Sequence, residues 1–414
     1  MKLSVTGLGY IGLPTALLFA SKGLCVSGVD MNKSVVNKLN NKELHIEEEG
    51  LQALLVQTID SKNFKATTTV ETADYYIIAV PTPHLEDNSC DVTFLKSAVM
   101  KLKNVIKSGD TIIVESTIGP RTMEDIVQPM IESFGFTVGK DIYLAHCPER
   151  VLPGKIIHEM IYNNRIIGGI TEACTKKASI LYKTLVKGSL LETKASTAEM
   201  SKLMENTYRD VNIALANELV KISDTLNINA LDVIKLANEH PRVNIHTPGP
   251  GVGGHCLAVD PYFIVASDKK NTEIISKARA INNSMPDFVI DKVNKIMETI
   301  NGKKITVLGL TYKGNIDDIR ESPALDIYHE LKLKSKYEVV AQDSHVKLDW
   351  VENDIQKSLV DSDLALILTD HYEYKDLIEY IPNNMKQAII FDTKNIVNHD
   401  NSVIYYNFNN VFDI

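Results

Sequence analysis

The sequence predicts an α/β protein in which a long central helical region joins two doubly wound parallel sheets. Strand-like and helical segments alternate through the first 195 residues and again after residue 301. Between them, residues 197–225 are apolar at helical spacing and contain no Gly or Pro. Alternating β and α units favour parallel sheets with helices on both faces. We therefore expect three parts, at residues 1–195, 196–300 and 301–414.

The composition narrows the class of protein. The chain has 414 residues, enough for two or three domains that each bury a core. A net charge of −9, with lysines scattered among acids, argues against a nucleic-acid-binding surface. The five cysteines show no CxxC or Cys/His metal spacing, so we expect a cytoplasmic protein without a bound metal. The N-terminus does not resemble a signal peptide and no apolar run approaches roughly 20 residues, so we expect no membrane partner.

The first segment has the complete pattern of a dinucleotide-binding unit. A strand at Lys2–Thr6 leads into Gly7-Leu8-Gly9-Tyr10-Ile11-Gly12, a helix follows at Pro14–Ser21, and a strand at Val26–Val29 ends on Asp30. The glycines allow a tight turn and close approach of a pyrophosphate, whose charge the helix N-terminus favours. A carboxylate at position 30 suits ribose hydroxyls and repels a 2′-phosphate, which favours NAD over NADP. The alternative is a glycine-rich turn in some other α/β domain; a cofactor site would use Gly7, Gly9, Tyr10, Ile11, Gly12 and Asp30.

Three further strands are predicted in this part, at Tyr75–Val80, Thr111–Glu115 and Ile142–Ala145, with helical segments near residues 91–106 and 121–134. Ligands of doubly wound sheets lie beyond the carboxyl ends of the strands. The residues at those ends are separately compatible with ordinary turn chemistry, but together at one edge they favour a binding site. They are Pro81, Thr82, Pro83, Ser116, Thr117, Cys147, Pro148, Glu149 and Arg150, of which Pro81, Thr82 and Thr117 are expected at the cofactor.

The central part begins with Ser196-Thr197-Ala198-Glu199, which has the pattern of a capping box and predicts a helix that runs to Thr225. Lys202 and Asn206 lie four residues apart, so both project from one face of this helix. By themselves they are more typical of a solvated helix surface than of a site. Further helices are predicted near residues 230–238 and 273–300, the second interrupted near Pro286.

The stretch His246–Phe263 has the sequence HTPGPGVGGHCLAVDPYF. Its glycines and prolines disfavour helix and strand, and they predict a tight loop that a ligand approaches closely. Cys256 in this loop is a candidate nucleophile, with Asp260 four residues downstream. The alternative is that Cys256 is a small buried apolar side chain, which is the commoner role of a free cysteine.

The last part predicts a second, smaller α/β domain. Strand-like runs occur at residues 305–310, 338–341, 365–368 and 388–391. The turn after the first of them lacks GxGxxG, so we expect no second dinucleotide there. Lys313 and Arg320 near this turn suit phosphates or sugar hydroxyls. A structural salt bridge of Arg320 with a neighbouring acid is an equally good interpretation, and the candidates are Asp317, Asp318 and Glu321.

Six motifs in chain order carry a resemblance to a known family. They are GLGYIGLP, VESTIGPRT, HCPERVLPG, AEMSKLMENTYRDVNIALANEL, HPRVNIHTPGPGVGGHCLAVDPYF and GLTYKGNIDDIRESPA. Over essentially its whole length the chain resembles the UDP-glucose/GDP-mannose dehydrogenase family. Within that family it is most similar to the members that act on UDP-N-acetyl-D-mannosamine in bacterial surface-polysaccharide synthesis.

The resemblance implies two Rossmann-like domains and a four-electron oxidation of a sugar 6-hydroxyl to a carboxylate, with two NAD molecules reduced in turn. It makes Cys256 the nucleophile that captures the aldehyde as a thiohemiacetal and then carries a thioester, which water cleaves. Lys202 and Asn206 match a pair that steadies the oxyanion at C6. Asp260 matches an acid near the thiol.

Further roles follow from the same resemblance. Glu149 and Thr117 match residues that handle protons and water, and Arg320 matches an arginine that reaches the active site or the cofactor. A homodimer is implied, paired through the central helical region. The implied contacts with the UDP-sugar are Glu149, Arg150, Lys202, Asn206, Arg242, His246, Gly253 and Lys313.

One departure from the family bears on the substrate. UDP-glucose dehydrogenases have GGxCFxKD around the cysteine, whereas this chain has Val259 in place of the Lys. The resemblance therefore implies an N-acetylamino sugar, with Arg242 or His255 as a substitute cation. The alternatives are the same chemistry on UDP-N-acetylglucosamine, UDP-glucose or GDP-mannose, and a non-catalytic nucleotide-binding protein of the same fold. A pure binder has no need of a nucleophile such as Cys256.

Overall fold

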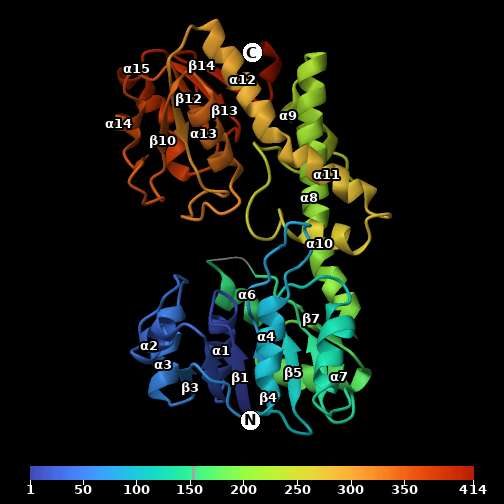
Figure 1. The fold of residues 1–414 in the computed structure, drawn as a ribbon. Coiled ribbons are helices and arrows are strands. Elements are labelled where there is room, and N and C mark those ends of the chain that lie inside the picture. The colour runs from blue at the N-terminus through green and yellow to red at the C-terminus, as the bar shows by residue number, and fades with distance from the viewer. Residues whose placement is uncertain (152–153) are drawn as a thin grey trace. The chain divides into compact units, whose positions relative to one another are not determined.

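In the computed structural model the chain forms two compact units, Met1–Met204 and Glu205–Ile414. The boundary between them falls within one long helix, α8 (Ala195–Leu226). The structure describes residues 1–151 and 154–414; Leu152 and Pro153 of the HCPERVLPG motif lie outside the described residues. Each unit has its own sheet (Figure 1). None of the helices in the described part of the chain combines the length and apolar character that crossing a membrane requires.

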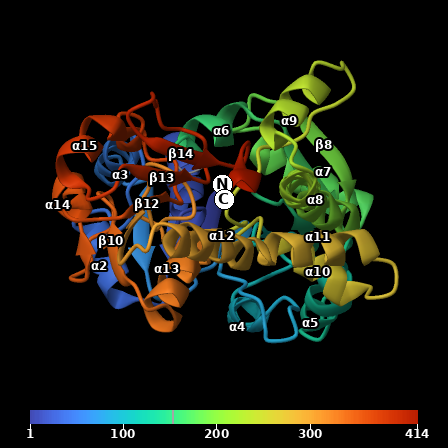
Figure 2. The same ribbon diagram turned by 90° about the horizontal axis from the view of Figure 1, so that it is seen from above.

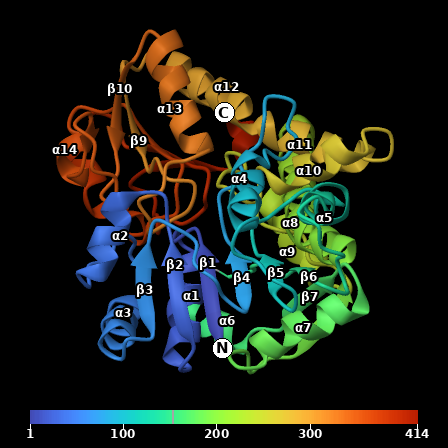
Figure 3. The ribbon, with the colours of Figure 1, turned by 60° about the horizontal axis from the view of Figure 1, so that its bottom comes forward.

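The first unit holds an eight-stranded sheet in the order β3-β2-β1-β4-β5-β6-β7-β8. Figure 3 shows the strands from β3 to β7 side by side. All neighbouring strands are parallel except β6 and β7. The order reverses between β1 and β4, which is where open α/β sheets bind ligands. The strands are β1 (Lys2–Thr6), β2 (Cys25–Val29), β3 (Phe64–Thr67), β4 (Tyr75–Ile78), β5 (Thr111–Val114), β6 (Tyr143–His146), β7 (Arg165–Gly169) and β8 (Leu190–Lys194).

Helices cover both faces of this sheet, as predicted. The alternation of side chains along β4 shows this, because Ile77 joins the core under α1, α3, α6 and α7. Tyr76 and Ile78 instead join a second core under α4 and α5. The helices are α1 (Gly12–Ser21), α2 (Lys33–Asn40), α3 (Leu51–Asp60), α4 (Thr93–Leu102), a short π-helix η1 (Met123–Val127), α5 (Gln128–Glu132), α6 (Ile156–Tyr162) and α7 (Glu172–Tyr182).

The predicted capping box at Ser196–Glu199 is wrong. Helix α8 already begins at Ala195, directly after β8, so Ser196 lies inside it. The Glu199 carboxylate instead accepts hydrogen bonds from the backbone N–H groups of Arg121 (2.6 Å) and Met123 (2.8 Å). Glu199 therefore satisfies one N–H group just before η1 and the first N–H group of η1 itself, because a tertiary contact offers donors that the local pattern does not reveal.

Glu199 is expected to make the protein less stable as the pH rises. Burial raises the pKa of its carboxyl to about 7, against the opposing effect of the two N–H groups. The folded state therefore keeps a proton that the unfolded chain releases near pH 4.5. Its contribution to the free energy of unfolding is full below that pH and is lost as the pH rises through about 7, a change of up to about 3 kcal/mol.

The measurement is thermal denaturation of the parent protein and of Glu199→Gln between about pH 5 and about pH 8. Glutamine does not titrate, so we expect the Tm of this variant to depend less on pH. Glu132→Gln, at the exposed end of α5, is the control and should keep the parent slope. Equal slopes for all three proteins contradict the prediction.

The second unit holds a six-stranded, entirely parallel sheet in the order β11-β10-β9-β12-β13-β14. Helices α12 and α13 cover one face, and α14 and α15 cover the other. The prediction of a second doubly wound sheet is thus confirmed. The strands are β9 (Lys304–Leu308), β10 (Glu338–Gln342), β11 (Val351–Glu352), β12 (Leu364–Ile367), β13 (Ile389–Asp392) and β14 (Ile404–Asn407).

The helices of this unit follow the predicted pattern. The helix predicted at 273–300 is interrupted at Ser284, just before Pro286, so that α11 and α12 run one after the other, with α12 beside α13 (Figure 2). The division into three parts at residues 195 and 300 stays a prediction. The helices are α9 (Ala230–Asn238), α10 (Asp260–Ser267), α11 (Glu273–Asn283), α12 (Met285–Thr299), α13 (Pro323–Lys334), α14 (Ile355–Leu359) and α15 (Ile381–Asn384), with 3₁₀ turns at Tyr372–Tyr374, Leu377–Glu379 and Val411–Asp413.

Candidate active site

Two glycines of the first loop are required by close packing. Gly7 has φ +92°, and a Cβ there would lie 2.3 Å from the carbonyl oxygen of Ala79. A Cβ at Gly12 would lie 1.8 Å from the carbonyl oxygen of Gly7. Side chains at these positions would push the loop off β4 or off the start of α1.

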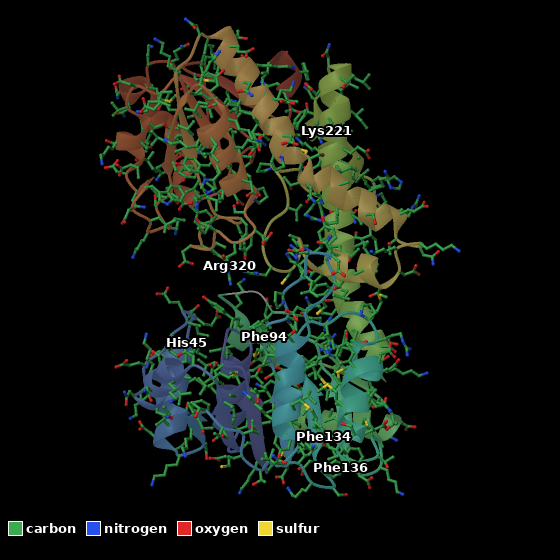
Figure 4. The ribbon with its side chains drawn as sticks, viewed as in Figure 1. His45, Phe94, Phe134, Phe136, Lys221 and Arg320 are labelled. Carbon is green, nitrogen blue, oxygen red and sulfur yellow. The ribbon has the colours of Figure 1, made fainter. Side chains whose placement is uncertain are left out.

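Gly9 leaves space for a dinucleotide, and Asp30 offers a carboxylate to it. Gly9 is exposed, and no described atom would come within 4 Å of a Cβ placed on it, so its open side admits a phosphate. Asp30 follows β2 and accepts the N–H of Leu8 at 3.1 Å, which ties the acid to the glycine loop. His45, labelled in Figure 4, lies 2.9 Å from the Leu8 carbonyl oxygen through Nε2. The side chain of Tyr10 is exposed beside this loop, and Ile11 directly precedes α1, so the residues present fit the cofactor that the sequence predicts.

Gly9→Ala is expected to weaken NAD binding without changing stability. The added methyl group contacts no other protein atom, but it occupies the open side of the glycine loop, where the pyrophosphate would accept hydrogen bonds from backbone N–H groups. Losing one hydrogen bond to a charged group costs about 1.5–3 kcal/mol, so the Kd for NAD should rise roughly 10- to 100-fold. Calorimetry gives the Kd and thermal melting gives the Tm. Gly12→Ala is the contrasting variant and should lower the Tm; a Gly9→Ala protein that binds NAD normally contradicts the prediction.

The strand-end residues of β4 and β5 come together as predicted. The Thr82 hydroxyl donates to the carbonyl oxygen of Thr117 at 2.5 Å. Ser116 donates to the carbonyl oxygen of Val80 at 2.7 Å. Pro81 is exposed beside them. These bonds join two loops at the carboxyl edge of the sheet, where a ligand of this fold is expected.

Glu149 is held by Arg150, which the sequence predicts at the site, and by Arg165, which the sequence does not indicate. Its carboxylate accepts the N–H of Arg150 at 2.6 Å and forms a short ion pair with the Arg165 guanidinium. Arg165 also donates to the buried Glu115 carboxylate at 2.5 Å. The Arg150 guanidinium donates to the carbonyl oxygen of Asn164. The available signal was a charged residue next to an apolar strand, since Arg165 opens β7 and Glu115 directly follows β5.

Lys202 is a buried cation, only 6% exposed, on α8. Its charge acts on His146 at the end of β6. Burial, with a smaller contribution from the charges of Lys202 and Arg165, lowers the pKa of His146 to about 3, against a hydrogen bond to Val114 that raises it. The interpretation of Lys202 as a solvated surface residue is therefore wrong, because the helix face that carries it is covered in the fold.

The predicted cysteine loop ends earlier than expected. Helix α10 begins at Asp260, so the last part of His246–Phe263 is helical. Pro261 is compatible with this, because the first turn of a helix does not need the missing N–H, and an acid is favoured at a helix N-terminus. The backbone N–H of Asp260 donates to the carbonyl oxygen of Cys256 at 2.9 Å.

Asn206 and Asp260 meet across 54 residues of sequence. The Asn206 amide donates to the Asp260 carboxylate at 2.6 Å. Asp260 is buried, whereas Cys256 is exposed. The alternative that Cys256 is a buried apolar side chain is thus wrong. An exposed thiol, a buried acid and an oriented amide lie within one short segment and the adjoining face of α8.

The glycines before Cys256 pack on the turn between β9 and α13. A Cβ at Gly253 would lie 2.2 Å from the carbonyl oxygen of Glu321. Gly254, with φ +84°, donates its N–H to the same oxygen at 3.3 Å, and a Cβ there would strike the ring of Tyr312. The two motifs GPGVGGHC and GLTYKGNIDDIRES therefore form one structural element.

Arg320, labelled in Figure 4, lies in this element. It makes a salt bridge with Asp318, which is one of the two interpretations that the sequence allows. Its guanidinium donates to both oxygens of Asp318, at 2.8 and 2.7 Å, while remaining 59% exposed. Burial raises the pKa of Asp318, but the hydrogen bonds and charge of Arg320 outweigh this and hold it below its usual value. His255 Nε2 lies 3.8 Å from the same carboxylate. Asp318 therefore contacts both the Arg320 guanidinium and the ring of His255, the residue that directly precedes Cys256.

The remaining predicted sugar contacts lie in the second unit. Lys313 and Arg242 are exposed. The Arg242 N–H donates to His240 Nδ1 at 3.3 Å. His246 stands edge-to-face with Tyr208, with ring centroids 6.1 Å apart. Their role toward a substrate stays a prediction.

Family models match three consecutive segments of the chain. They describe the NAD binding domain (residues 1–186), the central domain (196–284) and the UDP binding domain (306–399) of UDP-glucose/GDP-mannose dehydrogenases. The chain belongs to the UDP-glucose/GDP-mannose dehydrogenase family. As a member of that family it is an NAD-dependent UDP-sugar dehydrogenase, an oxidoreductase, which confirms the predicted family, cofactor and enzyme class.

Individual members of the UDP-glucose/GDP-mannose dehydrogenase family are similar along the whole chain. A UDP-N-acetyl-D-mannosamine dehydrogenase of Methanococcus maripaludis is 46% identical over 412 residues, covering 96% of this chain and 94% of the relative. An NDP-N-acetyl-D-galactosaminuronic acid dehydrogenase of Ralstonia solanacearum is 41% identical over 405 residues, covering 95% of each chain. The solved UDP-N-acetyl-mannosamine dehydrogenase of Staphylococcus aureus is 55% identical with a TM-score of 0.92, covering 100% of this chain and 99% of that chain.

Proposed function

We propose that this enzyme oxidises UDP-N-acetyl-D-mannosamine at C6 to UDP-N-acetyl-D-mannosaminuronate, for surface-polysaccharide synthesis. The observation that carries the proposal is the exposed Cys256 beside the Asn206–Asp260 pair, because an enzyme that stops at the aldehyde needs no thiol. Relatives named for this substrate, at 46% and 55% identity, support the choice of sugar. Val259 in place of the lysine of UDP-glucose dehydrogenases supports it further.

The first oxidation removes a proton from the 6-hydroxyl and a hydride from C6. Lys202 and the Asn206 amide stabilise the negative charge that develops on the oxygen. Asp260 holds the Asn206 amide, so one N–H of that amide is fixed before substrate arrives. NAD, when bound, accepts hydride, and two NAD molecules are used for each sugar. Gly7, Gly9, Gly12 and Asp30 are the residues proposed to hold it.

The second oxidation begins when the Cys256 thiolate adds to C6 of the aldehyde and forms a thiohemiacetal. The same oxyanion-stabilising groups act again while C6 loses its second hydride, which leaves a thioester. Water then adds to C6, the C6–S bond breaks, and the thiolate of Cys256 leaves. We propose that Glu149 accepts a proton of this water, with Thr117 as a hydrogen-bonding neighbour.

We also propose that the enzyme is a homodimer. Helix α8 leaves Tyr208, Leu215 and Ile222 exposed by 55%, 51% and 48%. They recur every seven residues, so they form one stripe on the helix. A second copy of the same helix would cover them, and sedimentation analysis of the protein tests this.

The test of the function is a panel of nucleotide sugars with purified protein and NAD. It contains the UDP derivatives of N-acetylmannosamine, N-acetylglucosamine, N-acetylgalactosamine and glucose, together with GDP-mannose. We expect two NADH per UDP-N-acetyl-D-mannosamine, read by absorbance, and a uronate product identified by mass spectrometry. One NADH per sugar refutes the four-electron scheme. A clear preference for another member of the panel replaces the proposed substrate.

A further inference from the structure

Arg165 lies at the centre of a buried cluster in the first unit. Its side chain is 8% exposed and contacts two carboxylates, those of Glu115 and Glu149, which are 0% and 8% exposed. Glu115 also accepts the Tyr182 hydroxyl at 2.5 Å and the Thr15 hydroxyl at 3.2 Å. The guanidinium lies over the Tyr182 ring, 4.8 Å from its centroid. The single cation of Arg165 thus forms ion pairs with two carboxylates.

Glu115 alone is enough to pair with this arginine. Both of its oxygens accept hydrogen bonds, so its place in the cluster is fixed by side chains from three elements, α1, β7 and α7. Burial raises the pKa of Glu115, Arg165 opposes that shift, and the charge of Glu149 adds to it. The second carboxylate therefore adds repulsion to a pair that is already complete. Buried ion pairs seldom stabilise a protein more than apolar side chains would, so stability does not explain Glu149.

The planar shape of the guanidinium explains how Glu149 is placed. Nη2 donates to Glu115 while Nη1 contacts Glu149, so the orientation of one acid sets the position of the other. The backbone N–H of Arg150 fixes the remaining Glu149 oxygen. A lysine would offer a single charge on a flexible stem and could not hold two carboxylates in this fixed geometry.

We propose that Arg165 is a positioning residue for hydrolysis of the thioester, acting through Glu149. This inference rests on the proposed function. In the step concerned, the water oxygen bonds to C6, the C6–S bond breaks, and the electron pair returns to sulfur as the Cys256 thiolate. The proton of the water goes to the Glu149 carboxylate and then to solvent. Arg165 takes no part in hydride loss, so its effect should be confined to this half of the reaction.

The experiment uses Arg165→Lys in rapid mixing with NAD and UDP-N-acetyl-D-mannosamine. We expect a burst of two NADH per subunit at a rate close to the parent's, then a steady state slower by roughly 10- to 100-fold, as expected when a reacting group is displaced by about 1 Å. Intact-protein mass spectrometry of the quenched reaction should show an acyl adduct that maps to Cys256. Glu149→Gln should give the same adduct.

Two further variants separate positioning from stability. Glu115→Asp keeps the charge but has a shorter side chain, so it should hold Arg165 less firmly. We expect a burst of two NADH followed by a smaller slowing of the steady state than in Arg165→Lys. This variant also tests the proposal if Arg165→Lys does not fold. Arg279→Lys is the matched control, because Arg279 forms a buried ion pair with Asp210 in the second unit at 2.6 Å and lies over Tyr262. It should lower the Tm without accumulating adduct.

The outcomes distinguish a failure of the role proposed for Arg165 from a failure of the covalent mechanism on which that role rests. If the burst and steady state of Glu115→Asp and Arg165→Lys fall by the same factor, or neither falls, Arg165 does not position the hydrolytic group and the covalent scheme stands. If Glu149→Gln and the parent make NADH but no variant carries an adduct on Cys256, the covalent scheme itself is wrong and the role of Arg165 falls with it.

Discussion

Replacing Cys256 with alanine is expected to lower the rate of uronate formation by on the order of 10⁴ or more, the range found when an enzyme's nucleophile is removed. The thiol of Cys256 is exposed. The backbone carbonyl oxygen of Cys256 accepts a hydrogen bond from the N–H of Asp260 at the start of α10, so the loop that presents the thiol is held in place. Alanine removes only the sulfur from this frame. The first hydride loss does not need sulfur, so residual NADH should not exceed one per sugar.

The control for this variant is Cys25→Ala. Cys25 is also an exposed free cysteine, at the start of β2, but nothing assigns it a chemical role. Its variant should keep parent activity, and iodoacetamide should inactivate Cys25→Ala as it inactivates the parent. Two NADH per sugar from Cys256→Ala at a rate within tenfold of the parent contradicts the covalent mechanism. Unchanged NADH production after complete alkylation of Cys256 does the same.

Much of the fold could be predicted because its signals are local. The run GLGYIG between two short strands, with Asp30 at the end of the second, specified the first βαβ unit, and the structure has β1, α1 and β2 at those places. The break at Pro286 was visible for the same reason, since proline removes a helix hydrogen bond wherever it stands. Local patterns failed where a distant partner decided the outcome. Glu199 has the spacing of a capping residue but bonds to N–H groups 76 and 78 residues earlier.

The candidate site shows the same limit. Cys256, Lys202 and Asn206 could be named from motifs, but the Asn206–Asp260 bond joins residues of two helices, α8 and α10, that no periodicity connects. Arg165 could not be named at all, because its chemistry depends on Glu115 and Glu149, which precede it by 50 and 16 residues. A charge beside an apolar strand shows only that a partner is needed, not which one.

Lys202→Met is expected to lower kcat by on the order of 10² to 10³, the usual cost of losing one group that stabilises an oxyanion. Lys202 is 6% exposed, and its charge contributes, after burial, to the lowered pKa of the buried His146 ring. A cation in such a place acts at a low effective dielectric, where it stabilises a developing negative charge far more than it would in water. Methionine keeps the length and apolar stem of the side chain, so the loss isolates the charge.

Lys221→Met is the matched control on the same helix. Lys221, labelled in Figure 4, is half-buried. It donates to the Ser284 hydroxyl at 2.5 Å and lies 5.8 Å from the centre of the Phe288 ring. Its replacement should change the Tm more than the rate. Steady-state kinetics decide how Lys202 acts. An interaction made only in the transition state lowers kcat and kcat/KM equally, whereas a rise in KM for the sugar with unchanged kcat would show that Lys202 binds substrate without stabilising the oxyanion.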